Sequence, residues 1–169
     1  KERGAKTIVI SDLPESQEAM EADLFIQASD TTALKAILKA LAEAGKTAEG
    51  MDALLPSLAD TVVDAQAKAA ADMLMAAKKA IVVAEQSWLS KEAAKAAADI
   101  AVLSGHIGAP RDGFLQIKSN VNSQGLSDLD IAAYSDKEDV MKSGSIQGMF
   151  IAGEDIDGFD RSGMEFVAV

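Results

Sequence analysis

The sequence contains no cysteine and only one histidine, His106. Without cysteine the chain can form no disulfide, and it offers no thiolate for catalysis, for zinc or for an iron–sulfur cluster. A single imidazole also excludes a metal site built from several histidines. We find no nucleophile beside a histidine base, no Gly-x-Ser-x-Gly elbow and no phosphate-binding loop. Autonomous catalysis by this chain is therefore not expected.

Aromatic residues, basic residues and long apolar runs are also scarce. Aromatics make up 4% of the chain, so the core must come from Ala, Val, Ile, Leu and the seven Met. The 16 basic and 27 acidic residues give a net charge of −11, which argues against nucleic acid because phosphate binding needs a basic surface. No apolar run approaches the roughly 20 residues that cross a bilayer. We expect a cytoplasmic protein without direct membrane insertion.

What the chain does have is enough apolar sequence for one domain. It is 169 residues long and 49% hydrophobic, which fits a single globular domain. It opens at Lys1 without a methionine and closes in an apolar strand pattern, 164–169. We therefore expect residues 1–169 to form one α/β domain excised from a larger multidomain protein.

Three short apolar runs each end at a carboxylate. The first, 7–12, ends at Asp12, the second, 80–85, ends at Glu85, and the third, 149–155, ends at Glu154 and Asp155. Apolar runs without strict alternation are typical of parallel strands covered on both faces. Ligands of open parallel sheets bind beyond the carboxyl ends of the strands. The three runs therefore predict a binding edge.

Helical patterns separate these runs. We expect one helix between a cap at 29–32 and Gly45, and further helices and strands along the chain. The other expected helices are 14–20, 58–79, 91–104 and 136–142, and the other strands are 23–28, 113–118 and 164–169. A polar loop is expected at 119–125. This alternation predicts a doubly wound, mainly parallel sheet with helices on both faces, a Rossmann-like fold.

Several motifs follow one another in a fixed order. An apolar strand that starts after Gly4 and ends at Asp12 is followed by a Gly-x-Ile-Gly-x-Pro-x-x-Gly pattern from Gly105 to Gly113. Next come Asn-Ser-Gln-Gly at 122–125 and a strand that ends in Gly-Glu-Asp at 153–155. In this order the motifs resemble the molybdopterin oxidoreductase family. They are most similar to the large iron–sulfur subunit of NADH-quinone oxidoreductase and to formate dehydrogenase alpha subunits.

The resemblance implies a domain that helps to enclose molybdopterin guanine dinucleotide in the intact parent protein. Strand-end carboxylates can accept hydrogen bonds from guanine or ribose, and amides match the edge of a pterin. The cofactor-binding residues implied are Asp12, Glu85, Asn122, Gln124, Gly153, Glu154 and Asp155. No cofactor is expected to be firmly bound to this fragment alone. The expected partners are the remaining domains of the parent and other subunits of a respiratory or formate dehydrogenase complex, peripheral to the inner membrane.

Other interpretations remain open for these residues. The strand-end acids can simply cap the helices that follow, where a carboxylate is favourable. Asn122, Ser123 and Gln124 can be turn and N-cap residues, and His106 can cap a helix end. The acids from Glu154 to Asp160 also raise the possibility of a calcium loop, although their spacing lacks the usual ligand order.

Two further functions compete with cofactor binding. The same family includes subunits that keep the fold without the metal cofactor, so a scaffold for electron transfer is one alternative. The other is a self-sufficient α/β module that binds a small molecule or acts as a receiver-like regulator. A receiver needs paired acids after its first strand, whereas Asp12 is alone there.

Overall fold

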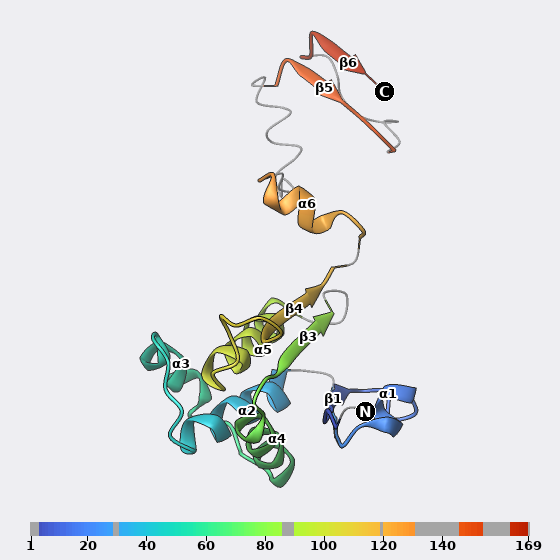
Figure 1. Ribbon diagram of the computed structural model, residues 1–169. Coiled ribbons are helices and arrows are strands. Elements are labelled where there is room, and N and C mark those ends of the chain that lie inside the picture. Colours follow the sequence, from blue (N-terminus) through green and yellow to red (C-terminus); the bar gives the residue numbers. More distant parts are fainter. Residues whose placement is uncertain are drawn as a thin grey trace. The chain divides into compact units, whose positions relative to one another are not determined.

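The computed structural model describes residues 4–28, 31–85, 90–118, 120–130, 146–153 and 163–168. The chain divides into two compact units, Lys1–Val121 and Asn122–Val169, and most of their elements are labelled in Figure 1. The helices are α1 (Gln17–Glu21), α2 (Thr31–Glu43), α3 (Met51–Leu58), α4 (Ala65–Ala76), α5 (Lys91–Leu103) and α6 (Ser123–Asp128). The strands are β1 (Ile8–Ser11), β2 (Leu24–Gln27), β3 (Ile81–Glu85), β4 (Gly113–Ile117), β5 (Gly148–Phe150) and β6 (Phe166–Ala168).

The strands pair in parallel, as the apolar runs predicted, but only two by two within the described residues. β1 pairs with β2, β3 with β4, and β5 with β6. In register, Ile8 lies opposite Leu24, and Ile81 lies opposite Gly113. The chain therefore belongs to the α/β class, with its strands in small parallel sheets.

Three helices form most of the core of the first unit. Helix α2 packs against both α4 and α5, and α5 also packs against β3 and β4. Leu38 and Leu41 of α2 are 1% and 0% exposed. On α4, Ala70 and Ala71 are buried, and on α5 Ala101 is fully buried. These small side chains let neighbouring backbones approach closely, which is how a chain poor in aromatics fills its interior.

Most element predictions are confirmed, and their ends have clear local causes. Helix α5 begins after Ser90, whose side chain accepts a hydrogen bond from the amide of Ala93, as predicted for a helix at 91–104. Helix α2 ends at Glu43, and the left-handed Gly45 closes it, so that the amide of Lys46 bonds the Leu41 carbonyl. The predicted helix 136–142 lies outside the described residues.

The predicted helix at 58–79 is wrong in its first third, 58–64. Helix α4 begins only at Ala65, because the carboxylate of Asp64 accepts a hydrogen bond from the amide of Ala67 at 2.7 Å and acts as the N-cap. Leu58 instead ends a separate helix, α3, which the sequence did not suggest. The predicted loop at 119–125 is also partly wrong, since α6 begins at Ser123.

One face of the β3–β4 pair carries apolar side chains that remain exposed within the described residues. Val82, Ala84 and Phe114 belong to the core against which α5 packs. On the opposite face, Ile81, Val83, Leu115 and Ile117 are 56%, 55%, 54% and 49% exposed. We call these four residues the open face. Parallel strands are usually covered on both sides, whereas the described part of this chain covers the pair on one side.

None of the helices in the described parts of the chain has the length and apolar character needed to cross a bilayer.

Candidate functional site

Two of the predicted site residues lie at the carboxyl ends of parallel strands in the first unit. Asp12 follows the last residue of β1, and Glu85 is the last residue of β3. The hydroxyl of Ser11 accepts a hydrogen bond from the amide of Leu13 at 3.1 Å, which turns the chain at Asp12. Both acidic side chains are exposed. The sequence therefore predicted their position along each strand, although the two strands belong to different pairs.

The amides of the Asn-Ser-Gln-Gly motif lie in the second unit, at the beginning of α6. Asn122 occupies the N-cap position, but its side chain makes no capping hydrogen bond. Its Oδ1 lies over Gly125, where an added Cβ would come within 2.3 Å of it. The amide of Gln124 donates to Asp128 Oδ1 at 2.6 Å along the exposed side of the helix. The side chain of Gln124 is therefore hydrogen-bonded within α6, whereas the side chain of Asn122 does not cap the helix.

The remaining predicted site residues follow β5. Gly153 has a φ of +76°, so the chain turns there in the left-handed region that glycine tolerates best. Glu154 and Asp155 lie outside the described residues, as do the other acids of the suggested calcium loop. In the parts of the chain that the structure describes, no group of three or more potential ligands could hold a metal ion.

The Gly-x-Ile-Gly-x-Pro-x-x-Gly motif forms the turn from α5 to β4. Gly105 has a φ of +82°, and the amide of His106 bonds the Ala101 carbonyl at 2.9 Å, while the Gly105 amide bonds that of Val102. These two bonds define a Schellman motif, which requires a left-handed residue at Gly105. The predicted capping role of His106 is thus confirmed for its backbone.

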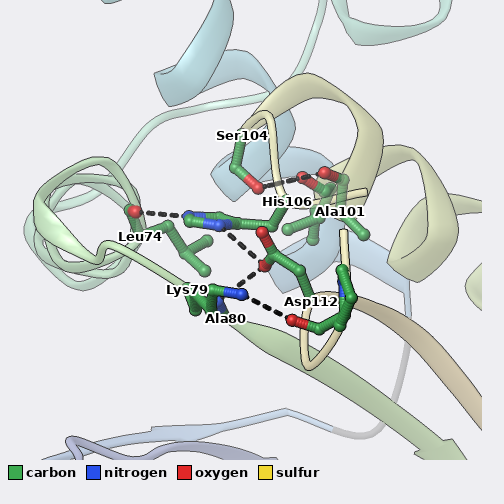
Figure 2. A network of polar contacts seen from close by, with 9 residues as sticks. Leu74, Lys79, Ala80, Ala101, Ser104, His106 and Asp112 are labelled. Atoms are coloured by element: carbon green, nitrogen blue, oxygen red, sulfur yellow. Dashed lines mark hydrogen bonds and ion pairs between the residues drawn. The ribbon is translucent and has the colours of Figure 1, made fainter. Parts of the chain in front are cut away.

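The His106 side chain does more than the sequence suggested. It is buried, and its two ring nitrogens reach opposite sides of a polar network (Figure 2). Nδ1 lies 3.0 Å from Asp112 Oδ1, and Nε2 lies 2.9 Å from the carbonyl oxygen of Leu74 on α4. Asp112 Oδ1 also accepts a hydrogen bond from the amide of Ala80 at 2.9 Å. The network therefore joins α4, the residue before β3 and the turn before β4.

Two further contacts hold the same turn in place. The ammonium of Lys79 donates to the carbonyl of Pro110, and the hydroxyl of Ser104 donates to the carbonyl of Ile100. The only signals of this cluster in the sequence were that His106 is unique and that Asp112 follows it across a turn. The partner from α4 is 32 residues away in the sequence, and no local pattern indicated it.

A recess in the first unit lies between α2 and α3, and its lining contains none of the predicted site residues. Its volume is about 460 Å³, and its lining includes Met51, Leu55 and Leu58. Lys39 also lines it, and the lysine ammonium donates to the carbonyls of Ala59 and Thr61 at 2.9 and 2.8 Å. This lysine ties the end of α3 to α2, so its first role is structural.

Compared with known proteins, the sequence matches no protein-family model, and no curated protein matches it at a significant level.

Proposed function

We propose that this chain is an internal α/β domain of a molybdopterin-type oxidoreductase, of the kind found in the large iron–sulfur subunit of NADH-quinone oxidoreductase and in formate dehydrogenase alpha subunits. The observation that carries the proposal is the ordered series of motifs, together with their positions at turns and strand ends. The Gly105–Gly113 motif supports it as a structural unit, because its left-handed glycine ends α5 and its Asp112 bonds the residue before β3.

We further propose that the sheet is doubly wound in the intact parent. The open face of β3 and β4 favours this arrangement, since four half-exposed aliphatic side chains on a parallel pair leave a large apolar area in water. Helices from neighbouring parts of the parent chain would cover that face. The remaining domains of the parent, and other subunits of a cytoplasmic complex peripheral to the inner membrane, are then the partners.

In this proposal Asp12 and Glu85 line a cleft for the guanine dinucleotide part of the cofactor. An ionised carboxylate accepts two hydrogen bonds from the ring N–H and the amino group of guanine, and such charge-assisted bonds are the strong ones. Asn122, Gln124, Gly153, Glu154 and Asp155 are the further candidates that the resemblance supplies. The fragment supplies binding and orientation, and the redox chemistry belongs to the cofactor and to the rest of the parent.

A scaffold role within the same parent is the second form of the proposal. It keeps the fold and the contacts with other domains, and it leaves the cleft empty. The engagement of Gln124 with Asp128 is the observation that favours it, because an amide committed to its own helix is less free to meet a pterin.

Binding of guanosine monophosphate to the 169-residue chain tests the cofactor form. We expect a saturable rise in melting temperature with this nucleotide and none with adenosine monophosphate. Asp12→Asn and Glu85→Gln should each weaken binding about tenfold, since a hydrogen bond to a charged group contributes about 1.5 kcal/mol. Glu49→Gln, which removes an equal charge from an exposed loop, is the control and should leave binding unchanged. Equal weakening by all three variants, or no binding by this chain together with no molybdenum in the intact parent, rules out the cofactor form.

A further inference from the structure

The two strand pairs of the first unit repeat one sequence pattern. The stretches 7–12 and 80–85, which contain β1 and β3, both read x-Ile-Val followed by three residues that end at an acid. The strands that pair with them, β2 and β4, both lie in an Asp-x-Phe-x-Gln pattern, at 23–27 and 112–116. Self-similarity of this kind is a signature of a repeated supersecondary unit. We call the two copies the β1–β2 module and the β3–β4 module.

The two modules also share one register. Val9 lies opposite Phe25 in the β1–β2 module, and Val82 lies opposite Phe114 in the β3–β4 module. The aspartate of each pattern directly precedes the second strand of its pair. It is therefore level with the residue that precedes the first strand.

In the β1–β2 module, Asp23 bonds the residue before β1 through its side chain and its backbone. Its Oδ2 accepts a hydrogen bond from the amide of Thr7 at 2.8 Å, and its own amide donates to the Thr7 carbonyl at 3.0 Å. The hydroxyl of Thr7 donates to the same carboxylate oxygen at 3.2 Å. The carboxylate thus takes the place of the backbone carbonyl that would continue the parallel ladder by one residue.

In the β3–β4 module, Asp112 makes the same contact with the residue before β3. Its Oδ1 accepts a hydrogen bond from the amide of Ala80 at 2.9 Å, and the amide of Gly113 donates to the Ala80 carbonyl at 3.0 Å. Alanine has no hydroxyl, and here the second neighbour of the carboxylate is the His106 ring, whose Nδ1 lies 3.0 Å from Oδ1. The side-chain neighbours of the two aspartates differ, whereas the bond from carboxylate to amide is common to both.

The connections within the modules are too different to explain a shared register. The bonded residue and its aspartate are 16 residues apart in the β1–β2 module and 32 residues apart in the β3–β4 module. The helix between the strands is α1, with five residues, in the first case and α5, with 13 residues, in the second. In a hairpin the turn fixes the register, but crossovers of such different lengths impose no common one. The contact that both modules share is the one made by the aspartate.

We propose that Asp23 and Asp112 are equivalent positioning residues, each of which sets the register of its parallel pair from the amino end. A shift of one residue would take the bonded amide away from the carboxylate. It would also turn the side chains of one strand to the opposite face. Because a hydrogen bond to a carboxylate is stronger than one between neutral groups, the contact disfavours such a shift.

The repeat also relates two residues of the proposed cofactor cleft. Asp12 follows Thr7 by the same number of positions as Glu85 follows Ala80. The two aspartates therefore hold both strand-end acids at the same level of their modules. This consequence alone rests on the proposed function, which gives those acids a ligand.

Amide hydrogen exchange of the ¹⁵N-labelled chain measures the two contacts separately. We expect Asp23→Ala to speed exchange of the Thr7 amide about tenfold and to leave the Ala80 amide unchanged, which is the loss expected for one hydrogen bond to a charged group. Asp112→Ala should do the reverse. Asp23→Asn and Asp112→Asn keep a side-chain acceptor and should retain most of the protection. Asp60→Ala, at an exposed position, is the control and should leave both amides unchanged. Exchange at Thr7 that is equally slow with and without the Asp23 side chain would overturn the proposal.

A cysteine pair measures the register itself, because the chain has no cysteine of its own. Ser11 and Gln27 are register partners at the other end of the β1–β2 pair, so Ser11→Cys combined with Gln27→Cys should form a disulfide on oxidation. Adding Asp23→Ala should slow disulfide formation several-fold, whereas adding Asp60→Ala should not. Equal rates in the two backgrounds would overturn the positioning role. Neither experiment uses a nucleotide, so failure of this proposal is distinct from failure of the cofactor proposal.

Discussion

At the scale of single residues, the turn between α5 and β4 combines a left-handed helix end at Gly105 with the buried polar contacts of His106. Its backbone could be predicted from the sequence, because Gly105 follows a helical pattern and a Schellman motif needs a left-handed residue there. The side-chain network could not be predicted, since Leu74 and Ala80 reach the turn only after the chain has folded. Local patterns report local hydrogen bonds, and this cluster depends on distant ones.

Removing one member of the buried pair should be costly. We expect Asp112→Ala to lower the free energy of unfolding by about 3 kcal/mol, because it leaves the Ala80 amide without its acceptor and the buried His106 Nδ1 without its partner. Asp60→Ala, at an exposed position, is the matched control and should change stability by less than about 0.5 kcal/mol. Urea unfolding followed by circular dichroism measures both. Equal effects would show that the pair adds nothing to the fold.

The left-handed conformation of Gly105 leads to a second prediction at the scale of single residues. No described atom lies within 4 Å of a Cβ added at Gly105, so substitution there costs conformational energy and no steric clash. We expect Gly105→Val to destabilise the chain by about 1 to 2 kcal/mol and Gly105→Asn by clearly less, because asparagine tolerates positive φ. Thermal unfolding compares the two variants. A larger loss for asparagine would contradict this account of the turn.

At the scale of elements, hydrophobic spacing and caps explain what the sequence could and could not predict. The i, i+3, i+4, i+7 pattern placed α2, and the same residues are its buried side. The boundary at Asp64 was missed because alanine-rich sequence favours a helix on both sides of it, and only the capping bond to Ala67 shows where α4 begins. Helix α3 was missed because a proline, Pro56, lies inside it.

The stability of the first unit should depend most on the buried side chains of α2. Leu41 is fully buried on the helix that packs against α4 and α5, so Leu41→Ala should lower the free energy of unfolding by about 3 kcal/mol. Leu13, which is 63% exposed, is the matched control, and Leu13→Ala should cost less than about 1 kcal/mol. Denaturant unfolding at fixed pH gives both values. Similar costs would mean that α2 does not organise this core.

At the scale of the whole molecule, the open face is what the sequence predicted least well. Apolar runs in β3 and β4 indicated strands covered on both sides, whereas Val83 and Leu115 are half exposed within the described residues. The pattern of a strand records every surface that it buries in the complete protein, including surfaces that other parts supply. An unpaired edge or open face of this kind favours association.

A charged substitution on the open face should affect the stability of the 169-residue chain and that of the intact parent differently. We expect Val83→Glu to change the free energy of unfolding of the 169-residue chain by less than about 1 kcal/mol, because the side chain is already 55% exposed. In the intact parent the same substitution should cost more than about 2 kcal/mol, since it would bury an unpaired charge. Ala84→Glu, on the covered face, should destabilise both proteins. Equal tolerance of Val83→Glu in both would contradict a doubly wound sheet.

The metal content of the purified intact parent tests the central proposal most directly. Both forms of the proposal place this domain beside iron–sulfur clusters, so we predict iron and acid-labile sulfide in comparable amounts. The cofactor form adds molybdenum and releasable guanine nucleotide, whereas the scaffold form predicts iron and sulfide alone. A parent that carries neither iron nor sulfide nor molybdenum would contradict the proposal.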